Sequence, residues 1–168
     1  MGAYEIGPPV VGWRICKQSR VKTAFDGEGA SRYPGRWNRK GVAVVYCAST
    51  LSLATLEYLV HLDPDEWPDD LVSIRFEVTA DVARAAEVVD ASTLPMDWRA
   101  TPGPDALKTI GSDWAKAGRS AMLVVPSAVT PSESNLLLNP RHADLQRLVM
   151  HSPEPLVFDP RLRKKAVR

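Results

Sequence analysis

Glu57 is the residue of this chain whose surroundings most suggest chemistry. It is the only charged residue between Gly41 and His61, in a stretch that otherwise has the composition of a protein interior. An ionised carboxylate is costly to bury without a partner, so such a residue is either paired or put to chemical use. On a helix it would share a face with Leu53 and Val60, one turn to either side. Periodicity alone leaves two interpretations open: a reactive carboxylate, or a Glu57 that pairs with a nearby arginine at the edge of an apolar stripe.

A basic, glycine-bearing stretch precedes this carboxylate. Arginine binds phosphate oxygens through a two-pronged fork, and glycine lets the backbone approach a ligand closely. The stretch therefore suits a phosphorylated metabolite, although a solvated loop would have the same composition. It lacks Walker-type and Rossmann glycine spacing, so neither a nucleoside triphosphatase nor an ordinary dehydrogenase is indicated. Its cations are Arg32, Arg36, Arg39 and Lys40, and its glycines are Gly27, Gly29, Gly35 and Gly41.

Aromatic residues are interleaved with these cations. Tyr33 and Trp37 lie in the basic stretch, and Tyr46 ends the apolar run that follows it. Flat rings stack on nucleobases or on nicotinamide, and a tyrosine hydroxyl can also fix an orientation. Such rings more often belong to the core, although their proximity to arginines strengthens the case for a binding role.

The sequence offers no familiar nucleophile or metal site. Ser127 directly follows Pro126, but a serine nucleophile needs a base, and no histidine has a local relation to it. No G-x-S-x-G motif is present, so we exclude a serine hydrolase and interpret Ser127 as a turn residue or a ligand contact. His61, His142 and His151 are too isolated to predict a metal site.

Composition indicates an ordinary globular protein. The chain has 168 residues, of which 45% are hydrophobic and 24% charged, which suits one domain with a sizeable core. A net charge of +1 disfavours a nucleic-acid-binding module that would use the basic stretch and the basic tail 161–168. The sequence shows no apolar run of ~20 residues and no secretory signal, so we expect a cytoplasmic protein without a membrane role. Cys16 and Cys47 are expected to be buried free thiols.

The candidate residues need a scaffold, and the hydrophobic patterns predict one rich in strands. Leu51 to His61 and Asp105 to Ala117 are expected to be helices, the first capped by Ser49 or Thr50 and the second ended by Gly118. Strands outnumber helices and do not alternate strictly with them, which predicts an α+β fold with a mixed, mostly antiparallel sheet. Two long loops are expected, 22–40 and 90–104, and the strands are expected at 10–16, 42–47, 71–78, 86–89, 121–125, 135–138, 145–150 and 156–158.

Five motifs in order, spread over residues 13–158, resemble the RES domain, a family named for an arginine, a glutamate and a serine. We therefore expect a RES domain over residues 1–160, followed by the basic tail 161–168. The motifs are Gly29-Ala30-Ser31-Arg32-Tyr33-Pro34-Gly35-Arg36-Trp37-Asn38, Val44-Val45-Tyr46-Cys47-Ala48, Leu53-Ala54 with Glu57, Val125-Pro126-Ser127, and Asn135-Leu136-Leu137-Leu138-Asn139-Pro140-Arg141-His142.

The resemblance implies a bacterial toxin of a type II toxin–antitoxin pair, with a fold similar to that of ADP-ribosyltransferase toxins. It implies cleavage of the nicotinamide–ribose bond of NAD, with transfer to water or phosphate, and consequent growth arrest. NAD would be a substrate, and no further cofactor or metal is implied. The implied partner is an Xre-like helix-turn-helix antitoxin, so DNA would be reached only through that partner, and self-association within the complex is expected. A mono-ADP-ribosyltransferase acting on a protein is the alternative, disfavoured because Thr55 stands where many arginine-directed transferases have a second carboxylate.

The same resemblance assigns roles to residues. Arg14 and Arg36 would hold the pyrophosphate and the adenine-side ribose, and Tyr46 would stack on nicotinamide. Glu57 would stabilise the ribosyl cation and bind ribose hydroxyls, and Ser127 would orient Glu57 or the ribose. These five form the expected catalytic set. The expected substrate-binding set is Arg14, Arg32, Arg36, Trp37, Asn38, Tyr46, Ser127 and Asn139.

Overall fold

β-branched and aromatic residues concentrate in the segments that form strands, where such side chains pack well on a pleated surface. The computed structural model describes residues 10–63 and 65–163. Within them, eight strands form one sheet in the order β4-β5-β6-β2-β1-β3-β7, with β8 also paired to β3. The strands are β1 (Val10–Lys17), β2 (Val45–Ala48), β3 (Leu71–Val78), β4 (Glu87–Val88), β5 (Met122–Pro126), β6 (Ser134–Leu138), β7 (Val149–Met150) and β8 (Glu154–Leu156).

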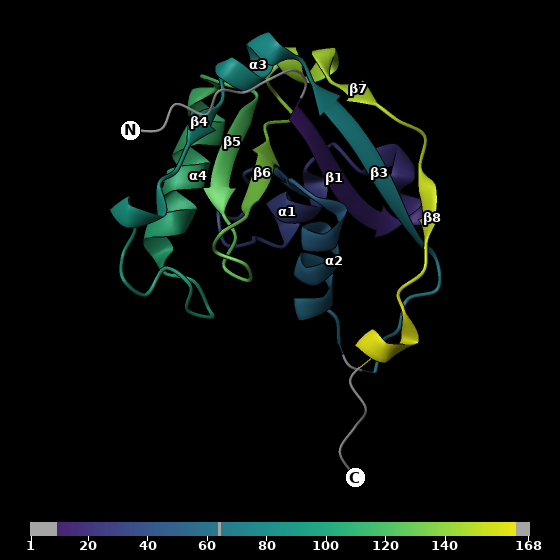
Figure 1. Cartoon of the computed structure of the whole chain (residues 1–168). Helices are drawn as coiled ribbons and strands as arrows, with labels where there is room; N and C mark the ends of the chain where they lie inside the picture. The colour runs from purple at the N-terminus through teal and green to yellow at the C-terminus, as the bar shows by residue number, and fades with distance from the viewer. Residues whose placement is uncertain (1–9, 64, 164–168) are drawn as a thin grey trace.

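The sheet confirms the predicted fold class. Only the β4–β5 pair is parallel, and the other pairs are antiparallel. β6 comes late in the chain but lies between β2 and β5, so it joins the β4–β5 side of the sheet to the β1–β3 side. The described residues form a single compact α+β unit (Figure 1).

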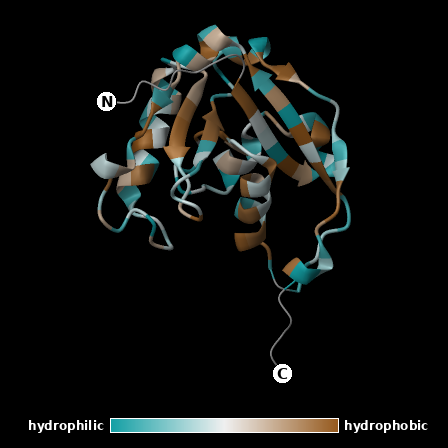
Figure 2. Cartoon of the chain, in the orientation of Figure 1, coloured by the Kyte–Doolittle hydropathy of each residue, from teal (hydrophilic) through white to brown (hydrophobic). Residues whose placement is uncertain are grey.

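Helix α2 (Leu51–Val60) begins where the sequence predicts. The Thr50 side chain accepts a hydrogen bond from the Leu53 backbone N–H at 3.0 Å, as an N-cap residue does. Leu53 and Ala54 pack on Ala48 and on the β1 residues next to it. The helix therefore covers β1 and β2, with apolar residues gathered along it (Figure 2).

Helix α4 (Asp105–Ala117) lies on the same face of the sheet as α2, over β5 and β6. Paired residues of neighbouring strands point to the same side, and the register aligns Asn135 with Ala48, and Ala48 with Trp13. Leu137 is two residues from Asn135 and therefore shares this face, where it packs with Trp114 of α4. Two helices thus lie side by side on one face.

The opposite face has its own core. Phe76, Val78, Leu136 and Leu138 pack there with Val82 of the short helix α3 (Ala80–Arg84). Gly12 is needed on this side because any Cβ at that position would lie 2.1 Å from the Phe76 ring. The sheet is therefore covered on both faces.

Most predicted elements are confirmed, and the differences have local causes. The strand expected at 42–47 begins only at Val45, although residues 42–44 are buried. The loop expected at 22–40 contains helix α1 (Glu28–Arg32), which begins where the Asp26 carboxylate accepts a hydrogen bond from the Glu28 N–H at 2.8 Å.

The C-terminal strands differ most from those that the sequence predicts. The strand expected at 145–150 is wrong for its first half, where Ala143–Arg147 forms a 3-10 turn and only Val149–Met150 pairs. The strand expected at 156–158 lies earlier, at β8. Both strands are at an edge of the sheet and short, so alternation gives little signal. Of the tail 161–168, residues 164–168 lie outside the described part of the chain, as do residues 1–9 of the predicted domain.

The cysteines are free and buried, as predicted. Burial raises the pKa of the Cys47 thiol to about 12, with the Arg14 charge opposing the shift. Burial likewise raises the pKa of Cys16. No helix among the described residues is long and apolar enough to span a membrane.

Close packing of α4 against the basic stretch gives a prediction for Gly111. A Cβ at this position would lie 1.9 Å from the Trp37 carbonyl oxygen, which is backbone and cannot turn aside. We expect Gly111→Ala to lower the free energy of unfolding by about 1–3 kcal/mol or more, measured by denaturant titration. The control is Gly29→Ala in α1, where a Cβ meets nothing within 4 Å and stability should be unchanged or slightly higher. Equal stability of the two variants would contradict the packing described.

Candidate functional site

The Glu57 carboxylate is held through one of its oxygens. The Ser127 hydroxyl donates to Glu57 Oε1 at 2.7 Å, and the Asn135 side-chain amide donates to the same oxygen at 2.6 Å. Oε2 makes no hydrogen bond within the part of the chain that the structure describes. The carboxylate thus has one oxygen fixed by the protein and one left for a ligand.

The direction of the Ser127 hydroxyl is determined by the turn that follows it. Its oxygen accepts hydrogen bonds from the Val129 N–H at 3.1 Å and the Thr130 N–H at 3.0 Å. The residue is 0% exposed, and these two bonds occupy its lone pairs, so its hydrogen is left to donate to Glu57. Ser127 is therefore built as a donor toward the carboxylate and is poorly placed to act as a nucleophile.

Helix α2 is joined to the start of β6 at two levels. At its N-terminus, the Thr50 hydroxyl contacts the Glu133 carboxylate at 3.2 Å, and the Ser49 N–H donates to the Ser134 carbonyl at 3.2 Å. Two turns along the helix, Glu57 reaches Asn135 of β6. The position of Glu57 therefore follows from the seating of α2 against β6.

Arg36 is a cation whose charge interacts with that of the Glu57 carboxylate. Its Nη1 donates to the carbonyls of Trp98 at 2.7 Å and Ala100 at 2.9 Å, which fixes the guanidinium against the 98–103 loop. Partial burial lowers the pKa of Arg36 below its usual value, and electrostatic interactions with the nearby Glu57 and Tyr46 oppose the shift. An arginine keeps its charge under these conditions, so it can hold an anion beside Glu57.

Tyr46 uses its hydroxyl internally and leaves only its ring for a ligand. The hydroxyl donates to Asn38 Oδ1 at 2.7 Å and accepts from the Trp37 N–H at 3.0 Å. Gly35 lies directly against it, since a Cβ there would be 2.7 Å from the hydroxyl oxygen. Burial raises the pKa of Tyr46 above 10.0, so the phenol stays protonated.

Trp37 and Asn38, which were expected to bind substrate, are interior residues in this structure. Trp37 is 2% exposed and packs with Trp114 and Leu123 in the core between α4 and the sheet. Asn38 is 0% exposed, and its amide donates to the Ala30, Arg39 and Val42 carbonyls. Both side chains shape the turn that carries Arg36.

Arg14 approaches the same strands from the other face of the sheet. It pairs with Ile74 of β3, on the side that carries Cys16, and not on the side where Trp13 lies near α2. Its Nη1 donates to the Tyr46 carbonyl at 2.6 Å, and its buried Nε has no partner among the described residues. The structure therefore links Arg14 to the backbone that positions Tyr46 and not directly to Glu57.

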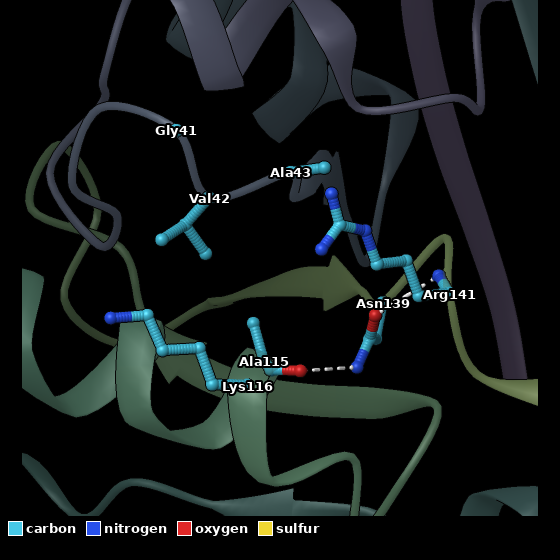
Figure 3. A pocket seen from close by; sticks show the side chains of 7 residues that line it. All are labelled: Gly41, Val42, Ala43, Ala115, Lys116, Asn139 and Arg141. Carbon is cyan, nitrogen blue, oxygen red and sulfur yellow. Dashed lines mark hydrogen bonds between the residues drawn. The ribbon is translucent and has the colours of Figure 1, made fainter.

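Arg32 and Asn139 lie away from Glu57. Arg32 is exposed at the end of α1 and faces Glu28 at 3.5 Å. Asn139 is 1% exposed, and its amide donates to the Ala115 carbonyl at 2.9 Å (Figure 3). It belongs to a separate small cleft of about 80 Å³ that Glu57 does not line. We therefore base the candidate site on the hydrogen-bonded cluster and not on this cleft, whose lining is Gly41, Val42, Ala43, Ala115, Lys116, Asn139 and Arg141.

Asn135 is the site residue that the sequence reasoning missed. It opens the Asn135–His142 motif, but nothing in the local pattern of a short strand distinguishes a polar first residue that contacts a helix from one that contacts solvent. Only the antiparallel register of β2 and β6, which aligns Asn135 with Ala48 beside α2, would have revealed it. Among the described residues, no group of three or more His, Cys, Asp or Glu side chains could hold a metal ion.

The architecture places the chain in a structural class. It matches the M. tuberculosis MbcT–MbcA toxin–antitoxin complex with a TM-score of 0.68 over 88% of this chain and 84% of the matched chain, at 18% identity. This likeness supports the α+β fold that the sheet defines.

The family follows from sequence similarity. The RES domain model matches residues 11–159, and the chain belongs to the RES domain family. It is 40% identical to the Prs ADP-ribosylating toxin of Sphingobium sp. over 92% of this chain and 97% of that protein. It is 38% identical to the toxin Res of Yersinia enterocolitica, over 90% of this chain and 98% of that protein.

A substitution can distinguish the contribution of the Tyr46 hydroxyl from that of its ring. Tyr46→Phe keeps the ring but removes both hydroxyl hydrogen bonds, so we expect the free energy of unfolding at pH 7 to fall by about 1–3 kcal/mol. The matched control is Tyr33→Phe, because Tyr33 is 83% exposed and should tolerate the change.

The raised pKa of Tyr46 also predicts that the free energy of unfolding depends differently on pH in wild type and in Tyr46→Phe. The phenol of Tyr46 ionises near pH 10 in the unfolded chain but at higher pH in the folded one, so its stabilising contribution is lost as pH rises above 10. Denaturant titrations between pH 8 and 11 should show a smaller loss of stability in Tyr46→Phe than in wild type. Parallel curves would contradict the burial of this hydroxyl.

Proposed function

We propose that this protein is a toxin that consumes NAD by breaking the bond between nicotinamide and ribose. The observation that carries the proposal is the Glu57 carboxylate, which two donors fix through Oε1, while Oε2 has no hydrogen bond among the described residues and the charge of Arg36 is close enough to interact. RES relatives named as toxins support the toxin assignment. The proposed site combines a fixed negative charge with a cation and an aromatic ring, as cleavage of a charged dinucleotide requires.

Each group has a role in this reaction. When the C1′–N bond breaks, its electron pair goes to the nicotinamide ring and neutralises the pyridinium, which leaves positive charge on the ribose. Glu57 stabilises that charge and accepts a hydrogen bond from a ribose hydroxyl at Oε2. Arg36 binds the pyrophosphate, and the Tyr46 ring stacks on nicotinamide. Arg14 supports the strand pair that carries Tyr46.

Water or inorganic phosphate is the acceptor that we favour, with a protein side chain as the second candidate. The name of the Sphingobium relative, Prs ADP-ribosylating toxin, favours protein transfer. Against it, Thr55 occupies the place of a second carboxylate, and its hydroxyl donates to the Leu51 carbonyl at 2.9 Å. That hydroxyl is engaged within α2, where it is poorly placed to activate an acceptor.

The proposal extends to partners. The structural neighbour is a toxin–antitoxin complex, which supports an antitoxin for this chain as well. We propose an Xre-like helix-turn-helix protein in that role, with DNA reached only through it and more than one toxin copy in the assembly. Action in the cytoplasm follows from NAD as the target.

Nicotinamide release from NAD tests the reaction. Purified protein freed of antitoxin should release nicotinamide, and Glu57→Gln should lower the rate by roughly 100-fold or more, because it removes the charge that stabilises the transition state. Arg36→Ala should lower activity through a higher KM for NAD. The control is Glu154→Gln on exposed β8, which should match wild type. No release from wild type, with and without phosphate, would contradict the proposal.

The acceptor and the cellular effect need separate measurements. NAD labelled in its adenylate part should give free ADP-ribose or its phosphorylated form in a lysate, whereas protein-bound label would favour the second candidate. In cells, Glu57→Ala and Arg36→Ala should relieve growth arrest while circular dichroism shows an intact fold.

A further inference from the structure

Two donors share one oxygen of Glu57, and the second of them, Asn135, has no role in the motif-based assignment. Its amide nitrogen lies 2.6 Å from Oε1, slightly closer than the Ser127 hydroxyl at 2.7 Å. A carboxylate that accepts two hydrogen bonds on one oxygen is restrained against rotation about its terminal bond. A second donor strengthens that restraint.

The orientation of the Asn135 amide is determined by its neighbours. The Ser127 oxygen already accepts two backbone N–H groups, so only its hydrogen points to Glu57. Oε1 is an acceptor, so the Asn135 nitrogen must face it, and the Asn135 oxygen is directed elsewhere. That oxygen is buried and has no partner among the described residues.

A buried acceptor without a partner lowers stability, so its presence calls for a compensating reason. A leucine of similar size would avoid this cost but would give Glu57 no second donor. The unpaired Asn135 oxygen thus lowers the stability of the fold, while the Asn135 amide fixes the orientation of the Glu57 carboxylate. Functional sites commonly show such a loss of stability.

We propose that Asn135 is a positioning residue for the reaction: together with Ser127 it fixes Glu57 Oε1 and thereby turns Oε2 alone toward the ribose of the substrate. Asn135 acts through Glu57 and touches no reacting atom. The role in catalysis rests on the function proposed above, whereas the geometry of the Asn135–Glu57 pair does not.

Two substitutions separate positioning from a purely structural role. Asn135→Leu should lower kcat by roughly 10–100-fold with little change in KM, because a charge-assisted hydrogen bond is lost. Its unfolding midpoint should be unchanged or higher, because the unpaired buried oxygen is also removed. Asn135→Asp places a second carboxylate against Glu57, so the acidic limb of its pH–rate profile should move to higher pH.

The matched control is a buried hydrogen-bonding residue away from Glu57. Ser120 accepts from the Trp114 indole at 2.9 Å and donates to the Met122 carbonyl at 3.0 Å. Ser120→Ala should lower the unfolding midpoint and leave kcat and the pH–rate profile as in wild type. The opposite pattern in Asn135→Leu, with the midpoint lowered and kcat retained, would overturn the proposal.

A measurement independent of activity tests the geometry itself. The side-chain amide of Asn135, assigned in ¹⁵N-labelled protein by its disappearance in Asn135→Leu, should lie downfield and shift when Glu57 is changed to Gln. If wild type releases no nicotinamide but this shift occurs, the proposed function fails and the positioning of Glu57 by Asn135 stands. If the chemical shift of the Asn135 side-chain amide is unchanged in Glu57→Gln, the inference is overturned, whatever the activity of the protein.

Discussion

Partial burial of the Glu57 carboxylate requires hydrogen-bond donors, and the apolar helix that carries it supplies none. The donors come instead from Ser127, just after β5, and from Asn135 at the start of β6. α2 itself packs on β1 and β2. Glu57 Oε1 therefore receives both hydrogen bonds only when the β5–β6 part of the sheet and the β1–β2 part that carries α2 have come together. The other oxygen, Oε2, has no hydrogen bond among the described residues and remains for function.

A second buried polar group organises the cationic side of the site. The Tyr46 hydroxyl forms hydrogen bonds with Trp37 and Asn38, the two residues that directly follow Arg36 in its turn. α4 supports the turn from behind, where Gly111 allows the Trp37 carbonyl to approach the helix. Arg36 is then fixed by carbonyls of the 98–103 loop. The cation and the carboxylate are thus positioned by separate networks.

The sequence predicted long elements well because their signals are local. Helix α4 and strand β3 have the predicted bounds, since a clear apolar stripe and clear alternation specify them. Glu57 was found because a lone charge in an apolar segment is visible without any fold. The burial of Trp37 and Asn38 could not be predicted, because motif membership does not distinguish a residue that binds a ligand from one that shapes the loop. Neither the contact of Asn135 with Glu57 nor the place of Arg14 on the opposite face could be predicted, because only strand register decides which face a side chain occupies.

The central position of β6 has a consequence for the order of events during biosynthesis. The strand lies between β2 and β5, yet more than three quarters of the chain precede it. A nascent chain that ends before residue 134 has two unjoined portions of sheet and a Glu57 without its Asn135 contact. The contact spans 78 residues, so it cannot form by local folding. Both donors to the carboxylate are present only after β6 has been synthesised, and the order of synthesis therefore delays the appearance of an organised site.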